Sequence, residues 1–194
     1  MDNPEKIQRW QEYQQRTAGG KPRPLLQEAL QYVQRKGNAL DLGAGALNDA
    51  SFLVEQGFGE VVAVDITPPF KAIDAESGQF SYRQMPFSAY EFPAEHFDLI
   101  SAQYSLPFDN QGFQKVWKNI YGSLKKGGIF VGQLFSARDD WFGRSGMIFH
   151  SEAEVQSLSE QFEIIKQEER EYTEKEERAK HWHYFDLILM KSLT

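Results

Sequence analysis

The chain has 194 residues, of which 41% are hydrophobic and 25% are charged, proportions that indicate one globular domain and exclude a disordered chain. It contains no cysteine, which excludes disulfides and thiolate metal sites and favours a reducing, cytoplasmic location. Its formal net charge of −7 makes a nucleic acid an unfavourable partner, because the phosphate backbone would be repelled.

The first 37 residues predict two helices joined by a loop at Gly19 and Gly20. The first begins at Pro4 and carries an apolar stripe at helical spacing, formed by Ile7, Trp10 and Tyr13. The second runs from Pro24 to a stop at Gly37. No predicted helix has the roughly 20 apolar residues that a membrane span needs, so no membrane partner is expected. We expect residues 1–37 to form a helical cap segment and residues 38–194 the core of a single domain.

From Ala39 onward, strands alternate with helices, a pattern that predicts a parallel sheet covered on both faces. Five strands are expected at residues 39–42, 61–64, 80–84, 97–102 and 129–135, with helices at 48–56 and 113–124. The tail predicts a helix at 152–159 and strands at 162–166 and 181–191. Residues 168–180 between these strands are acidic and too polar to cross a sheet face, so we expect a solvated hairpin tip there. The expected fold is α/β: a doubly wound, mostly parallel, seven-stranded Rossmann-like sheet with a C-terminal antiparallel hairpin.

A glycine-rich turn follows the first strand of this core and opens a helix. Gly43 and Gly45 would let a ligand approach the main chain, where the amides of a helix N-terminus face the crevice. Asp65 ends the next strand, where a carboxylate can hold the ribose hydroxyls of a nucleoside. The structural alternatives are close backbone packing at the glycines and capping of the Thr67 turn by Asp65.

Two residues discriminate among nucleoside cofactors. A dinucleotide fingerprint has a third glycine where this chain has Asn48. Asp41, two residues before the first glycine, would face a cationic ligand more favourably than a pyrophosphate. The chain also lacks a second domain to hold a hydride acceptor. S-adenosylmethionine is therefore favoured over a nicotinamide cofactor.

At this point the sequence resembles the class I S-adenosylmethionine-dependent methyltransferases, and within them the small bacterial tellurite-resistance-type and methyltransferase type 11/12 enzymes. The resemblance is carried by ALDLGAGALNDA (39–50), VVAVDITP (61–68), FDLISAQYSLPF (97–108) and LKKGGIFVGQLF (124–135). RDDW (138–141), FHSEAEV (149–155) and KHWHYF (180–185) match a narrower subgroup. Leu47 stands where the family has a third glycine.

The resemblance implies a set of cofactor contacts. Gly43, Ala44 and Gly45 would approach the methionine part, with Asp41 near its ammonium group; Asp65 would hold the ribose and Ile66 would flank the adenine. Pro86 and Phe87 lie where the family contacts the adenine edge, although the Asp common there is missing. Ala102 and Gln103 would line the reactive side. The leading segment would cover the cofactor, and we assign Tyr13, Arg16 and Asn48 to the same site.

The methyl acceptor is expected to be a small molecule of unknown identity. Tyr104 could present its ring to the sulfonium, and His150 could act as a base near neutral pH. Their structural alternatives are ordinary packing for Tyr104 and a position before the Ser151–Glu154 capping box for His150. Acceptor contacts are assigned to Gln133, Arg138, Trp141 and His183. Arg138 could instead pair with Asp139 or Asp140. No metal site is expected, because His181 and His183 share a strand face without a third ligand.

We therefore predict an S-adenosylmethionine-dependent methyltransferase acting on a small molecule. A catalytically inactive nucleoside-binding scaffold of the same fold and, less favoured, a nicotinamide-dependent oxidoreductase are the alternatives.

Overall fold

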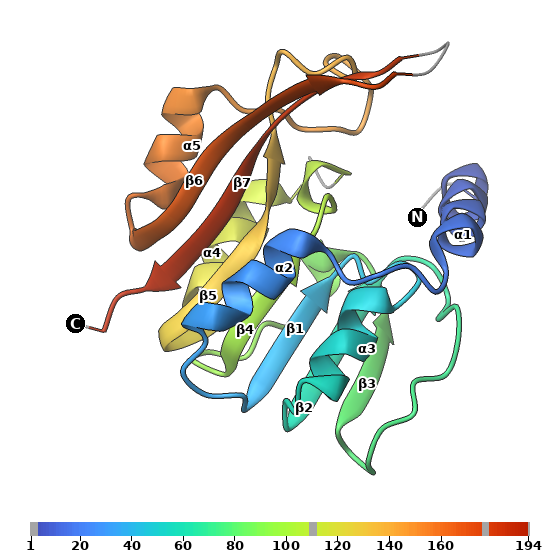
Figure 1. The fold of residues 1–194 in the computed structure, drawn as a ribbon, viewed down its shortest axis with the longest axis vertical. Coiled ribbons are helices and arrows are strands. Elements are labelled where there is room, and N and C mark those ends of the chain that lie inside the picture. Colours follow the sequence, from blue (N-terminus) through green and yellow to red (C-terminus); the bar gives the residue numbers. More distant parts are fainter. Residues whose placement is uncertain (1–3, 109–111, 176–178, 194) are drawn as a thin grey trace.

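The computed structural model describes residues 4–108, 112–175 and 179–193. Within them, seven strands form one sheet in the order β3-β2-β1-β4-β5-β7-β6 (Figure 1). The strands are β1 (Asn38–Leu42), β2 (Glu60–Asp65), β3 (Phe80–Gln84), β4 (Phe97–Ala102), β5 (Leu124–Phe135), β6 (Phe162–Thr173) and β7 (His181–Lys191). Strands β1 to β5 run parallel, and β7 lies antiparallel between β5 and β6. The predicted doubly wound sheet and its C-terminal hairpin are confirmed.

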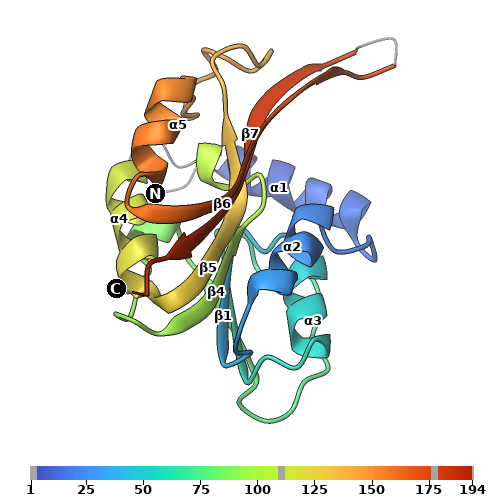
Figure 2. The same cartoon turned by 60° about the vertical axis from the view of Figure 1, so that its left-hand side comes forward.

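Helices cover both faces of the sheet (Figure 2). The faces carry α2 (Pro24–Ala29), α3 (Asn48–Glu55), α4 (Phe113–Ser123) and α5 (Glu152–Ser159), whereas α1 (Pro4–Thr17) lies past the strand ends. Short 3-10 turns occur at Leu30–Tyr32, Phe87–Ala89 and Leu106–Phe108. One hydrophobic cluster joins the sheet to α2 and α3, and the other joins it to α4 and α5. The central strands are apolar on both sides because each face is buried. No helix among residues 4–108, 112–175 and 179–193 is long and apolar enough to cross a membrane.

Two boundaries differ from the sequence prediction. The second helix ends at Ala29 and one 3-10 turn, and does not reach Gly37. The reason is that residues 36 and 37 already accept hydrogen bonds from Gly59 and Glu60, which draws the chain toward β1. Strand β5 begins at Leu124 and not at residue 129, because Leu124 pairs with Phe97 before an irregular register.

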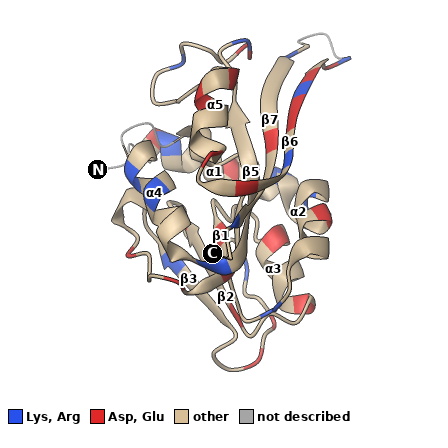
Figure 3. Cartoon of the chain, turned by 90° about the vertical axis from the view of Figure 1, so that its left-hand side faces the viewer, with Lys and Arg blue, Asp and Glu red and all other residues tan. Residues whose placement is uncertain are grey.

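The acidic segment after residue 166 is the larger correction. Strand β6 continues to Thr173, so residues 168–173 are not a hairpin tip. An edge strand has one solvated side and tolerates charge, and ion pairs stabilise this one. Arg170 pairs with Asp186 at 3.0 Å, and Lys166 pairs with Glu28 at 2.8 Å. The resulting β6–β7 arm extends beyond the body of the fold and carries both basic and acidic segments (Figures 1 and 3).

Candidate active site

The bend after β1 combines three residues in the left-handed region. Gly43 has a φ of +81°, Gly45 of +47° and Leu47 of +63°. A Cβ on Gly43 would lie 2.3 Å from the Cβ of Ser105, so glycine is required there for close packing. A Cβ on Gly45 would meet only a backbone oxygen at 3.8 Å, which leaves that side of the loop open to a ligand. Leu47 adopts a left-handed conformation that usually favours glycine, and its side chain is fully buried.

Asp65 joins the end of β2 to this bend. Its Oδ2 accepts a hydrogen bond from the Gly45 amide at 2.9 Å, and its Oδ1 accepts from the Thr67 amide and hydroxyl at 3.0 and 2.8 Å. Asp65 therefore caps the turn at Thr67 and also joins the end of β2 to the bend after β1. A carboxylate offers about four acceptor sites. One remains on Oδ2, which suffices for a single further hydroxyl.

Asp41 lies beneath the bend and is 2% exposed. It accepts a hydrogen bond from the backbone of Ala50, while its Oδ2 is buried without any hydrogen-bond partner. Burial, together with repulsion from Asp49 and Asp65, raises the pKa of this carboxyl well above its usual value. A positively charged ligand beside Oδ2 would relieve both costs, because it supplies a donor and an opposite charge.

The N-terminal helix is fastened over the same bend. Gln14 of α1 is 3% exposed, and its amide nitrogen donates to the Gly45 carbonyl at 2.9 Å and to the Thr67 hydroxyl at 2.5 Å. The side-chain nitrogen of Asn48, at the start of α3, donates a hydrogen bond to the backbone carbonyl of Thr17, at the end of α1, at 2.8 Å. This bond holds the two helices together. Tyr13 and Arg16, which the sequence assigns to the cofactor, are exposed on the same helix.

The adenine side of the predicted site lies at the ends of β2 and β3. Phe87 is buried, and its ring tip would lie 3.5 Å from a Cβ on Gly43. Pro86, directly before Phe87, and Ile66, directly after β2, are half-buried, and Ala102 is fully buried at the end of β4. Ala44 is also buried within the bend. These residues follow the ends of neighbouring parallel strands, so the topology brings the predicted adenosyl contacts to one edge of the sheet.

Tyr104, after β4, has a left-handed φ of +55° that buried amides hold in place. The side-chain oxygen of Gln133 accepts a hydrogen bond from the backbone amide of Tyr104 at 3.0 Å. The side-chain nitrogen of Gln133 donates to the carboxylate of Asp186 at 2.9 Å and to the side-chain oxygen of Gln103 at 3.3 Å. Gln133 is 2% and Gln103 is 9% exposed. Both predicted contact residues therefore have their polar groups committed to this network beneath Tyr104. Burial raises the pKa of the Tyr104 phenol, which stays protonated near neutral pH.

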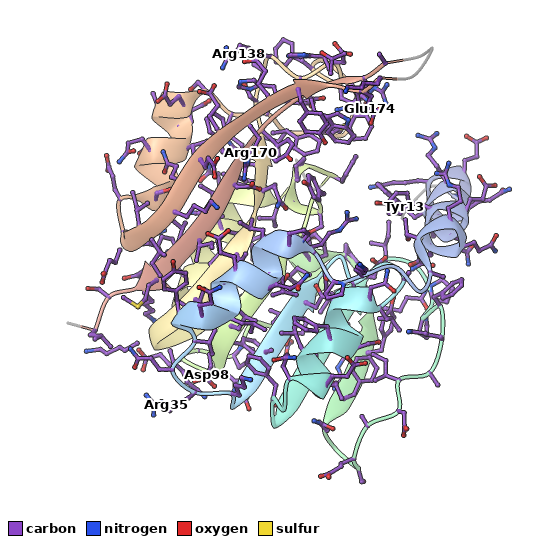
Figure 4. The ribbon with its side chains drawn as sticks, viewed as in Figure 1. Tyr13, Arg35, Asp98, Arg138, Arg170 and Glu174 are labelled. Carbon is purple, nitrogen blue, oxygen red and sulfur yellow. The ribbon has the colours of Figure 1, made fainter. Side chains whose placement is uncertain are left out.

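The residues assigned to the acceptor fall on two faces of the arm. Trp141 lies with Tyr104, since both contact the Trp182 ring, at centroid distances of 5.1 and 6.3 Å. His183 points to the opposite face because side chains alternate along a strand. There it contacts Arg138, which pairs with Glu169 of β6 and not with Asp139 or Asp140. In Figure 4, Arg138 lies at the outer edge of the arm, away from Tyr13.

Arg138 borders an open recess of about 420 Å³, whose other lining residues include Ser136, Ser151 and Glu169. None of the residues lining it belongs to the bend after β1 or to the tips of β1 and β2. Among the described parts of the chain, no group of three or more His, Asp or Glu could hold a metal ion. The structure thus brings Tyr104, Gln133 and Trp141 together and separates Arg138 and His183 from them.

His150 precedes the capping box of Ser151 and Glu154, which is confirmed. The ring packs on Phe113 at a centroid distance of 4.7 Å, and the residue is 4% exposed. Its Nε2 is buried without a partner, and burial lowers the pKa of the imidazole. The neutral His150 ring packs against α4, as expected if the residue has a structural role before α5.

Sequence reasoning missed three residues of this region: Gln14, Arg23 and Lys180. Gln14 is one of several glutamines on a polar helix, so nothing in the sequence distinguishes it. Arg23 and Lys180 occur in segments that read as a loop and a hairpin tip. Only the tertiary contacts described above and below reveal their positions.

The strand order, the bend after β1 and the acid after β2 together define a Rossmann-like methyltransferase fold. Residues 40–132 match the family model described as a methyltransferase domain. No curated protein matches the chain.

Solved structures give the same result for the fold. A Burkholderia thailandensis 1,6-didemethyltoxoflavin-N1-methyltransferase, bound to 1,6-didemethyltoxoflavin and S-adenosylhomocysteine, is 18% identical with a TM-score of 0.67, over 99% of this chain and 92% of that one. A Methanosarcina mazei S-adenosylmethionine-dependent methyltransferase is 18% identical with a TM-score of 0.63, over 90% and 100%. TehB from Haemophilus influenzae is 15% identical with a TM-score of 0.67, over 86% and 61%.

Residues 40–132 therefore carry a methyltransferase domain. The family identified from the sequence motifs is confirmed, and S-adenosylmethionine is the cofactor of that class.

Proposed function

We propose that the protein transfers a methyl group from S-adenosylmethionine to a small-molecule acceptor, at the ends of β1, β2 and β4. The observation that carries this proposal is Asp41: a buried carboxylate with one unpartnered oxygen, beneath a bend that is open at Gly45. Its charge and position suit the ammonium of the cofactor. The enzyme similar in fold from Burkholderia thailandensis is a 1,6-didemethyltoxoflavin-N1-methyltransferase, which supports a small acceptor.

In this proposal each element of the site has a role. Asp41 holds the ammonium group, the remaining acceptor site on Asp65 takes one ribose hydroxyl, and Phe87 contacts the adenine. Residues 4–37 cover the bend after β1 through Gln14. The absence of cysteine supports a cytoplasmic location. The bacterial affiliation within the family stays a prediction.

When bound, S-adenosylmethionine would supply an activated methyl group, carried on a sulfonium, to a lone pair of the acceptor. The chain has to align the two reactants, a contribution of up to roughly 7–11 kcal/mol in well-oriented reactions. The Gln133 network serves this purpose because it fixes the backbone of Tyr104 at the reactive side. A proton released by a protonated acceptor passes to solvent, since His150 packs against α4.

Calorimetric titration with S-adenosylmethionine, S-adenosylhomocysteine and NAD tests cofactor binding. We expect both adenosyl ligands to bind and NAD to give no heat. Asp65→Asn should weaken adenosyl binding, while Asp74→Asn, a charge change on an exposed loop, should leave it unchanged. Binding of NAD alone, or equal binding by the Asp65→Asn variant, would contradict the proposal.

Transfer is tested by incubating the protein with methyl-labelled donor and a metabolite extract. Label should pass to a small molecule in the presence of the protein, and this transfer should be lost in the Asp41→Asn variant. Cofactor binding without any labelled product would favour the inactive scaffold.

A further inference from the structure

Six aromatic side chains form a continuous cluster next to the proposed methyl-transfer site. This aromatic wall consists of Tyr104, Phe135, Trp141, Tyr172, Trp182 and Tyr184. Ring centroids lie 5.3 Å apart for Tyr104 and Tyr184, 5.1 Å for Trp141 and Trp182, and 5.9 Å for Phe135 and Trp141. The rings of Tyr172 and Trp182 are stacked at 6.4 Å with planes 20° apart. The rings come from the ends of β4 and β5, the loop after β5, and the β6–β7 arm.

Four rings of the aromatic wall are at least partly exposed, whereas Phe135 and Tyr184 are 0% and 6% exposed and pack behind them. None of its six members is among the buried residues of either core cluster. Tyr172 is 49% exposed, and Trp182 and Trp141 are half-buried. Figure 4 shows ring side chains gathered near Glu174, which is labelled on the arm. A contiguous, partly exposed aromatic surface beside a reaction centre is typical of a ligand-binding wall.

The wall is adjacent to the methyl-donor side through Tyr104. Tyr104 follows Gln103 at the tip of β4, and its neighbour Ser105 lies against Gly43 of the bend. The Tyr104 hydroxyl donates to the Tyr184 hydroxyl at 3.1 Å, which connects the tip of β4 to the arm. A ligand resting on the wall therefore meets the reactive edge of the bound cofactor in the proposed site.

Charges at the wall select against a cationic ligand. The Arg23 guanidinium lies 5.3 Å from the Tyr104 ring centroid, and among the described residues it has no carboxylate at ion-pair distance. The Lys180 ammonium lies 3.1 Å from the Trp182 centroid and 4.2 Å from that of Trp141. Both cations occupy ring faces that a ligand cation would need.

The nearby carboxylates have partners of their own. Asp139 pairs with Lys180 at 2.8 Å, Glu174 accepts from the Trp182 indole at 2.7 Å, and Asp186 pairs with Arg170. Among the described residues, the guanidinium groups of Arg23 and Arg144, the latter 4.9 Å from the Trp141 centroid, lie on wall rings without a carboxylate at ion-pair distance. Glu174 is the carboxylate whose partner at the wall is a neutral group.

We propose that the methyl acceptor is a planar aromatic or heteroaromatic molecule, neutral or anionic, that stacks on the aromatic wall. This inference rests on the proposed methyl transfer, since the wall is the surface that faces the donor. Flat rings bind such a surface through offset or edge contacts at centroid distances of roughly 4.5–7 Å. A saturated molecule of the same size and charge lacks these contacts.

Binding of two matched probes tests the proposal. Tryptophan fluorescence and calorimetry follow 2-naphthoate, which is flat, and decahydro-2-naphthoate, which is not, with S-adenosylhomocysteine present or absent. We expect 2-naphthoate to bind roughly tenfold more tightly than the saturated probe and more tightly than the cation N-methylquinolinium. Equal binding of the two naphthoates, tighter binding of the cation, or no binding of 2-naphthoate would overturn the proposal.

A pair of leucine variants locates the binding surface. Tyr172→Leu removes an exposed ring of the wall, and we expect about fivefold weaker binding of 2-naphthoate with unchanged affinity for S-adenosylhomocysteine. Tyr32→Leu removes a similarly exposed ring, 40% exposed, on the turn after α2, and should change neither. No effect of Tyr172→Leu would refute the assignment. If S-adenosylhomocysteine fails to bind the wild type, the proposed function is contradicted. The comparison of the two naphthoates in the absence of S-adenosylhomocysteine then still tests whether the aromatic wall binds flat molecules.

Discussion

Replacing Asp41 by asparagine should stabilise the ligand-free protein and weaken cofactor binding at the same time. The carboxylate is buried, one of its oxygens has no partner, and Asp49 and Asp65 repel its charge. An unpaired buried polar group costs about 1–3 kcal/mol, and asparagine removes the charge while it retains part of this cost. We therefore expect a gain of about 1 kcal/mol in the unfolding free energy at neutral pH, or roughly 2–4 °C in Tm for a chain of this size.

The sign of the pH dependence follows from the raised pKa of Asp41. A group whose pKa is higher in the folded than in the unfolded state favours folding at low pH. Its stabilising effect is lost as the pH rises from the unfolded pKa, about 3.9, through the higher folded pKa. In that window the wild type should lose stability relative to the Asp41→Asn variant, and above it the difference should be constant.

Cofactor binding should respond in the opposite direction. A hydrogen bond to a charged group contributes about 1.5–3 kcal/mol, so the variant should bind S-adenosylhomocysteine roughly 10- to 150-fold more weakly. Because a cation favours the ionised carboxylate, binding to the wild type should release a proton within the same pH window. Urea denaturation and calorimetry in buffers of different ionisation enthalpy measure these effects. A variant that is less stable than the wild type and binds equally well would refute the reasoning.

Three further predictions concern the supports of the site. Gln14→Leu should cost about 1–3 kcal/mol in urea denaturation and expose α1 to protease, whereas Gln8→Leu on the exposed side of the same helix should not; equal behaviour would show that α1 is held otherwise. Leu47→Gly should be more stable than Leu47→Ala by about 1–2 kcal/mol. Both variants lose the buried side chain, but only alanine retains the strain of the left-handed backbone conformation. The reverse order of stability would show that this strain is absent. Lys180→Met should lower the unfolding free energy by about 3–5 kcal/mol, since it leaves the buried Asp139 carboxylate without its cation. A loss below about 1 kcal/mol would mean that the backbone amides of Trp141 and His183 alone stabilise this carboxylate.

The parallel core could be predicted from the sequence because its signals are local. Short β-branched strands alternate with helices, and the glycine bend lies between a strand and a helix. The positions of Gly43, Gly45 and Asp65 at strand ends follow from that alternation. Parallel strands then bring these residues to one edge of the sheet without any knowledge of side-chain contacts.

The arm could not be predicted in full, because its strand signal depends on tertiary context. Residues 168–173 are mostly charged, which usually indicates a loop, yet an antiparallel partner and solvent on the other side make them a strand. The same limit applies to the side chains of the arm. Alternation along the strand predicts His183 and Tyr184 on opposite faces, but which of these faces turns toward Tyr104 depends on tertiary packing. The sequence therefore could not separate Arg138 and His183 from the aromatic wall.

The crystal structure of the S-adenosylhomocysteine complex tests the central claim most directly. Our account predicts the amino group of the ligand at hydrogen-bond distance from Asp41 Oδ2 and one ribose hydroxyl at Asp65 Oδ2, with the sulfur facing Tyr104. A ligand bound elsewhere, or one that spans the crevice without contacting either carboxylate, would contradict it.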